Sequence, residues 1–135
     1  MTAPVYRSLC LAAIVGLCQL AFAATAPPPD ALLAAGRVDD AISSLQDRVS
    51  HSPKDAVAFN LLCRAHFMLG NWDAGITACE KAVALDPYNS RFHLWLGRLY
   101  GEKASHVRFW SAARLAGKVR NEFETAVRQI GRAHV

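Results

Sequence analysis

The 135-residue chain has no uninterrupted apolar run long enough to cross a membrane. Its longest apolar stretch extends from Leu9 to Ala24 and is broken by Gln19, whereas a membrane-spanning helix needs about 20 apolar residues. Arg7 before this stretch and the small residues of "AFA" at its end give it the layout of a secretory signal. We predict a signal peptide over 1–23, cleaved after Ala23, and an exported product, periplasmic or secreted, with no membrane span in the mature chain. An uncleaved membrane anchor is the alternative.

The sequence also lacks the features of strands and of enzymes. No apolar run alternates with period two, so no strand is predicted. There is no carboxylate pair, no glycine-rich phosphate loop and no Ser/His/Asp order, and the five histidines have no partner at metal-ligand spacing. We therefore expect a protein that is not an enzyme and has no metal and no cofactor.

Acidic residues are scarce in the second half of the chain. Residues 24–90 carry five basic and eight acidic side chains, whereas residues 91–129 carry eight and three. A basic half indicates either a surface that contacts anions or a solvated face. Because no strand platform carries interleaved aromatic and basic residues, a nucleic-acid partner is not expected.

What the sequence does contain is a set of amphipathic segments separated by helix-breaking residues. Asp30, Asp55, Asn71 and Asn89 or Ser90 stand at candidate helix starts, and glycines or prolines stand at the ends. These signals predict helices over 31–35, 38–51, 56–69, 72–86, 91–101 and 106–129. The last has an apolar stripe of Val107, Trp110, Leu115, Val119, Phe123 and Val127.

Two of these segments repeat with a fixed period. The stretches "GRVDDAISSLQDRVSHSP" and "GNWDAGITACEKAVALDP" align without a gap, and their prolines, Pro53 and Pro87, are 34 residues apart. With Gly70, Trp72 and Ala82, this pattern resembles the tetratricopeptide repeat, a 34-residue helix-turn-helix unit. The resemblance implies an all-α fold in which antiparallel helical hairpins stack as a short right-handed solenoid.

The repeat pattern divides the chain into segments. A proline-rich linker is expected over 24–29 and the repeat domain over 30–129, with a partial repeat at 30–53, a full repeat at 56–89, and a divergent repeat plus capping helix at 90–129. The final "IGRAHV" (130–135) is the in-frame translation of the sequencing-adapter bases ATCGGAAGAGCACACGTC. We interpret these six residues as an artefact.

In this family, the first helices of the hairpins form a concave groove that binds protein segments. The resemblance places six residues of this chain in that groove: Asn60, Arg64, Phe67, Arg91, Leu94 and Arg98. Arginine binds carboxylates through paired hydrogen bonds, which favours an acidic peptide or a C-terminal carboxylate. The family's carboxylate clamp is incomplete, because Leu61 and Trp95 replace polar residues, and a solvated basic rim is the alternative.

The chain is thus expected to be a non-catalytic scaffold that binds a protein or peptide partner in the cell envelope or outside the cell. The alternative is the N-terminal interaction region of a longer, truncated envelope enzyme or assembly factor. Homo-oligomerisation through the open end of the array is a further expectation.

Two cysteines remain after the signal, Cys63 and Cys79. They fall on facing helices of one hairpin, 16 residues apart, in a chain expected to reach an oxidising compartment. A disulfide between them and a pair of small buried thiols are both compatible with this placement.

Overall fold

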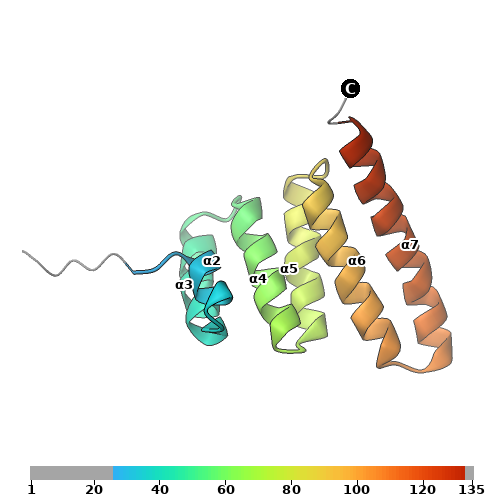
Figure 1. Cartoon of the computed structure of the whole chain (residues 1–135), viewed down its shortest axis with the longest axis horizontal. Coiled ribbons are helices and arrows are strands. Elements are labelled where there is room, and N and C mark those ends of the chain that lie inside the picture. Colours follow the sequence, from blue (N-terminus) through green and yellow to red (C-terminus); the bar gives the residue numbers. More distant parts are fainter. Residues whose placement is uncertain (1–25, 133–135) are drawn as a thin grey trace, which may run out of the picture.

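The computed structural model describes residues 26–132, which form six helices and no strand (Figure 1). The predicted signal peptide (1–23), the first two linker residues (24 and 25) and the last three residues (133–135) lie outside this part of the chain. The helices are α2 (Pro29–Ala34), α3 (Val38–His51), α4 (Ala56–Met68), α5 (Trp72–Leu85), α6 (Ser90–Ser105) and α7 (Phe109–Arg132). The fold is therefore all-α.

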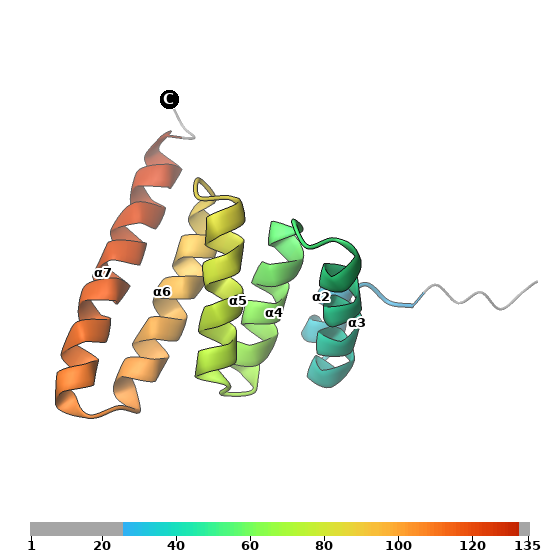
Figure 2. The same ribbon diagram turned by 180° about the vertical axis from the view of Figure 1, so that it is seen from behind.

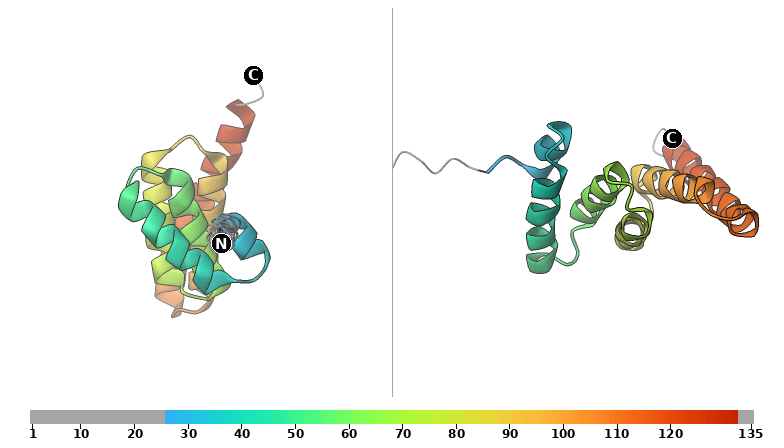
Figure 3. Two further views of the ribbon diagram at one scale, coloured as in Figure 1. Left: turned by 90° about the vertical axis from the view of Figure 1, so that its left-hand side faces the viewer. Right: turned by 90° about the horizontal axis from the view of Figure 1, so that it is seen from below.

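Each helix packs mainly on the helix next to it in the sequence, and consecutive helices run in opposite directions (Figures 1 and 2). The hairpins stack in a row as a solenoid, which Figure 3 shows from one end and from below. α4 also contacts α6, so the first helices of two successive hairpins are neighbours. The core follows this row, and Leu45, Cys63, Cys79 and Leu99 are its largest fully buried side chains.

The 34-residue period reappears in the geometry of the turns. Gly36 and Gly70 both have positive φ, +74° and +70°, the left-handed conformation that glycine adopts at a helix C-terminus without steric cost. Asp55 and Asn89 both cap the helix that follows them with a side-chain oxygen, as predicted. The same glycine turn and the same side-chain helix cap therefore occur at equivalent places in successive repeats.

The first helix begins earlier than expected. α2 starts at Pro29, with Pro28 as its N-cap, so Asp30 lies in the first turn and is not the cap. Proline suits the first helical position, because the amide hydrogen that it lacks would have no partner inside the helix. Pro29, which we assigned to the linker, is thus part of the repeat array.

The predicted apolar stripe of the last helix is only partly buried. Leu115 and Val119 pack against the core, but Trp110 and Val127 are exposed. The reason is that α7 packs on α6 alone among the described helices, so only a narrow arc of its surface is covered. The helix also starts at Phe109, three residues later than the predicted segment.

Candidate functional site

The candidate groove lies along α4 and α6, and both helices are fixed at their N-termini. The Asp55 carboxylate accepts a hydrogen bond from the Ala58 amide at 2.9 Å, and Asn89 Oδ1 accepts one from the Arg91 amide at 3.2 Å. Burial acts to raise the pKa of Asp55, but hydrogen bonds from Ala58 and Arg48 outweigh it and hold that pKa below its usual range. The cap of α4 is therefore a carboxylate at neutral pH.

Arg64 of α4 and Arg98 of α6, predicted to share the groove wall, meet at the ring of Trp95. The guanidinium carbon of Arg64 is 5.3 Å from the ring centroid of Trp95, and that of Arg98 is 4.8 Å away. Both distances are within the range of cation–π attraction. Trp95, which the sequence comparison treated only as a departure from the clamp, is thus the residue that brings the two arginines together.

Aromatic rings continue from Trp95 along the array. Phe67, a predicted groove residue, meets Trp95 edge-on, with ring centroids 5.5 Å apart, and also meets Trp72 edge-on at 5.9 Å. Trp72 in turn stacks on His106 at 5.6 Å. We call Trp95, Phe67, Trp72 and His106 the aromatic row. It gives the groove an apolar surface next to its arginines.

Asn60, Arg64 and Arg91 line one pocket between the starts of α4 and α6. The pocket has a volume of about 370 Å³. Asn60 is only 4% exposed, and its Nδ2 has no hydrogen-bond partner among the described residues. A buried donor without a partner costs roughly 1–3 kcal/mol, so a ligand carbonyl at this place would remove a penalty that the free protein carries.

The arginines of the groove are also available to a ligand. Within residues 26–132, none of Arg64, Arg91 and Arg98 takes part in an ion pair. Leu94, predicted for the same groove, lines an adjoining apolar hollow of about 500 Å³ beside Phe123 and Val127 of α7, and Arg91 lines both this hollow and the pocket at Asn60. The structure therefore brings five of the six predicted residues to the α4–α6 surface, in two clusters around Asn60 and Trp95, and places Leu94 beside α7.

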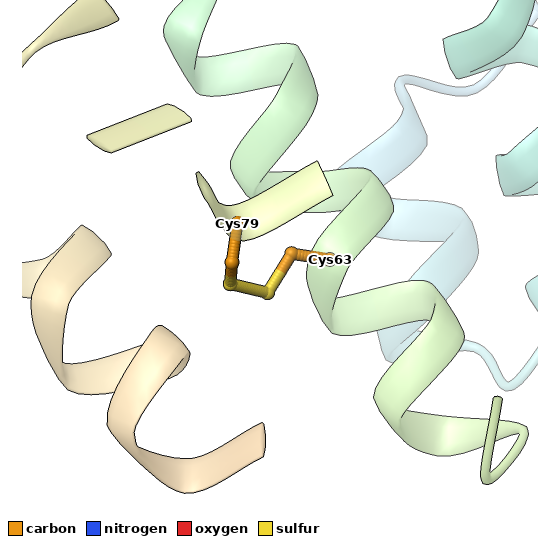
Figure 4. Close-up of a disulfide and its surroundings, with 2 residues drawn as sticks. All are labelled: Cys63 and Cys79. Atoms are coloured by element: carbon orange, nitrogen blue, oxygen red, sulfur yellow. A yellow bond between two sulfur atoms is a disulfide. The ribbon is translucent and has the colours of Figure 1, made fainter. Parts of the chain in front are cut away.

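The two cysteines lie behind the groove, where α4 meets α5 (Figure 4). Cys63 and Cys79 are fully buried, their Cα atoms are 5.1 Å apart, and a disulfide joins their sulfur atoms. This bond would hold the groove helix α4 to the second helix of its hairpin.

Two of the histidines, His93 and His66, lie in packed surroundings between helices. His93 is buried, and its ring nitrogens lie 2.6 Å from a carboxylate oxygen of Glu122 and 2.9 Å from the Pro87 carbonyl oxygen, which ties α7 to α6. Desolvation lowers the pKa of His66 and favours its neutral form.

Among the described residues, no three His, Cys, Asp or Glu side chains gather as metal ligands would. From residue 26 to 132, no helix is both long enough and apolar enough to cross a bilayer.

Comparison with known proteins gives matches of two kinds. Residues 30–90 match the family model of the tetratricopeptide repeat. The solved structure "MamA RS-1 ArsTM double mutant" is 31% identical, with a TM-score of 0.57, and the match covers 72% of this chain and 53% of that one. "Crystal structure of MamA" is 20% identical, with a TM-score of 0.50, over 78% of this chain and 76% of that one. Comparison with curated protein sequences finds no match.

These matches agree with the architecture. The chain spans about half the length of the first MamA structure, and at 20% identity the second supports the fold alone. Folds of this kind typically serve as non-catalytic modules for protein–protein interaction. The 34-residue period, the matched region 30–90 and the structural neighbours show that this chain contains tetratricopeptide repeats over residues 30–90.

Proposed function

We propose that this scaffold binds a peptide segment of a partner protein in the groove between α4 and α6. The observation that carries the proposal is the amide of Asn60, which is buried without a hydrogen-bond partner beside two arginines that form no ion pair within the described chain. A peptide backbone carbonyl suits the Asn60 amide. A carboxylate suits the guanidinium groups, because it can accept two parallel hydrogen bonds from one arginine.

The groove also indicates what else the peptide should contain. Trp95 and Phe67 offer aromatic surface next to Arg64 and Arg98. An apolar side chain of the ligand would pack on these rings while a neighbouring acidic group reaches the arginines. We therefore propose a ligand with a C-terminal carboxylate or acidic side chain next to an apolar residue.

The experiment measures binding of an acidic peptide library by the wild type and by the double variant Arg64→Ala/Arg98→Ala. Loss of two hydrogen bonds to charged groups should cost on the order of 1.5–3 kcal/mol each, and added salt should weaken wild-type binding. The double variant Lys54→Ala/Arg128→Ala removes the same charge away from the groove and serves as the control. If both variants keep their helix content and bind the same peptides equally well, the groove arginines are only a solvated rim.

A second candidate is that this region is the N-terminal interaction part of a longer envelope enzyme or assembly factor. The observation in its favour is the apolar hollow at Leu94, Phe123 and Val127, which another helix could cover. The complete reading frame separates the two candidates, since a catalytic signature downstream supports the second. A second copy of the chain could cover the same hollow, and a molecular mass that rises with protein concentration would reveal it.

The location of the protein is also part of the proposal. Arg7, the apolar run and "AFA" support export through a cleaved signal peptide. N-terminal sequencing of the exported protein should then begin at Ala24. Soluble exported protein that still begins with Met1 would contradict cleavage.

A further inference from the structure

The start of α7 carries two large aromatic side chains that the rest of the described chain leaves uncovered. Phe109 is 76% exposed and Trp110 is 84% exposed. Their rings meet edge-on with centroids 5.4 Å apart, so they form one patch. Large exposed apolar patches mark surfaces that bind something, because apolar area in contact with water costs free energy.

The turn that precedes this aromatic pair is fixed to the body of the protein. His106, in the turn, stacks on Trp72 of α5 with an interplanar angle of 14°. Lys103, at the end of α6, forms an ion pair with Asp73 of α5. The turn lies at the end of the array opposite to α2, at the lower right of Figure 1. The aromatic pair is therefore held at a corner of the molecule.

The surroundings of the aromatic pair are basic. Residues 103–121 contain five Lys or Arg and no Asp or Glu. Asp73 neutralises Lys103, and Arg120 lies 3.9 Å from Glu124. The remaining three, which within the described chain take part in no ion pair, are Arg108, Arg114 and Lys118.

Two of these cations also line a hollow between α5 and α7 with a volume of about 380 Å³. Arg114 comes one helical turn after Trp110, so it lies next to the aromatic pair. Lys118 Nζ lies 4.7 Å from the ring centroid of Tyr100, whose hydroxyl donates a 2.6 Å hydrogen bond to Glu80. Burial and the Glu80 contact raise the pKa of Tyr100, so its phenol stays protonated. Glu80 also lines the hollow, together with the cations Lys103, Arg114 and Lys118, so basic side chains outnumber acidic ones there.

We propose that this corner of the protein docks on an anionic lipid membrane. Phe109 and Trp110 would enter the interface between headgroups and acyl chains, where aromatic rings are favoured. Arg108, Arg114 and Lys118 would face the lipid phosphates, and the hollow offers space for one headgroup. This surface is separate from the groove residues Asn60, Arg64 and Arg98, so the proposal goes beyond peptide binding.

The observations favour a membrane over the other anionic partners. Nucleic-acid sites stack bases on ring faces, whereas Phe109 and Trp110 meet edge-to-face at a protruding corner. A combination of exposed Trp and Phe with neighbouring Lys and Arg, and no acidic residue between them, is the pattern of interfacial membrane helices.

The experiment measures co-sedimentation with vesicles of phosphatidylcholine, with and without phosphatidylglycerol. It uses the chain from Ala24, which contains all six helices of the structure, with helix content checked by circular dichroism. We expect binding to the anionic vesicles only, weakened by salt. Each change of Arg108, Arg114 or Lys118 to Gln should lower the partition coefficient about fivefold, and Phe109→Ser/Trp110→Ser should lower it at least as much as one such change.

Matched controls come from the opposite edge of the array. Tyr88→Ser changes an aromatic residue that is 72% exposed in the α5–α6 turn, and Lys54→Gln removes a cation from the α3–α4 turn; neither should change the partition. In a second measurement, brominated lipids should quench the fluorescence of the wild type, and Trp110→Phe should abolish this quenching. The proposal is overturned if the wild type does not sediment, if Tyr88→Ser loses as much binding as Phe109→Ser/Trp110→Ser, or if RNA or an acidic peptide binds this surface while anionic vesicles do not.

Discussion

Gly75 lies where α5 closely approaches both α6 and α4, and its replacement by alanine tests the packing argument. A Cβ atom at this position would lie 3.0 Å from both terminal methyl carbons of Leu99 in α6 and 3.3 Å from Cβ of His66 in α4. Leu99 is fully buried, so its side chain has no free space to move into. Gly75→Ala should therefore push α6 away from α5.

The magnitude follows from two opposing effects. An alanine inside a helix is favoured over glycine by roughly 0.8–1.0 kcal/mol, whereas an extra methyl group in a well-packed core costs about 1–3 kcal/mol. Gly117→Ala in α7 is the matched control, because nothing lies within 4 Å of its added Cβ and only the helix preference applies. We expect Gly117→Ala to stabilise the protein and Gly75→Ala to be less stable than that variant by about 1–3 kcal/mol.

The assay is urea unfolding followed by circular dichroism, with the midpoint and the slope compared for the wild type and both variants. The same displacement should separate Arg64 from the ring of Trp95, so Gly75→Ala should also weaken peptide binding in the groove. If Gly75→Ala and Gly117→Ala stabilise the protein equally, α5 and α6 are not held at the limit of close approach and the reasoning is wrong.

Two other predictions concern the hairpin that carries α4. Thiol labelling of unfolded, unreduced protein from Ala24 should find neither Cys63 nor Cys79 free, and reduction should lower stability by about 3 kcal/mol for a loop of this length; two labelled thiols would refute the bond. Asp55→Ala should cost about 1 kcal/mol through loss of the helix cap, measured by the same unfolding assay. Because the pKa of Asp55 is lowered in the folded state, its contribution is present above about pH 4 and lost as the pH falls further, so stability of the variant should depend less on pH in that range than stability of the wild type. Equal acid sensitivity of both proteins would contradict this assignment.

The parts of the fold that depend on local sequence could be predicted from it. The caps at Asp55 and Asn89 and the positive-φ glycines at the helix ends depend on the residues within one turn of them. Because these features recur every 34 residues, the sequence predicts hairpins of the same kind one after another, which stack as a solenoid.

The exposure of side chains on the last helix could not be predicted in this way. An amphipathic stripe indicates which face prefers burial, but the number of neighbouring helices decides how much of that face is covered. α7 has α6 as its one neighbour among the described helices, and so Trp110 and Val127 stay exposed. The pairing of His93 with Glu122, 29 residues apart, likewise depends on tertiary packing alone.

The sequence predicts candidate groove residues but not Trp95, the residue at which Arg64 and Arg98 meet. The resemblance to the family predicts Asn60, Arg64 and Arg98 as groove residues. A family pattern compares each position with the residue usual there, so it counts Trp95 only as the loss of a polar clamp residue. The observation that could have found it is its spacing: Trp95 comes three residues before Arg98, which places both on one side of α6. A tryptophan beside an arginine on a face expected to bind a ligand is a candidate contact in its own right.

The basic residues in the second half of the chain lie on two different surfaces. Arg91 and Arg98 belong to the groove, whereas Arg108 and Arg114 belong to the corner at the start of α7. A single anionic partner is therefore not needed to explain the charge, and each surface has its own aromatic residues.

The aromatic row connects these two surfaces, since it begins at Trp95 in the groove and ends at His106 in the turn before Phe109. Contact between rings is not itself coupling, because energetic coupling requires that binding at one surface change the free energy of binding at the other. Linkage makes the relation reciprocal: any factor by which anionic vesicles change peptide affinity must equal the factor by which peptide changes vesicle partition. Phe67 contacts both Trp95 and Trp72, with ring centroids 5.5 and 5.9 Å away, so it is the ring that a displacement of Trp95 would reach first. The row is a continuous series of ring contacts between the proposed peptide groove and the corner proposed to dock on membranes, and measuring each binding reaction in the presence of the other ligand tests whether it couples them.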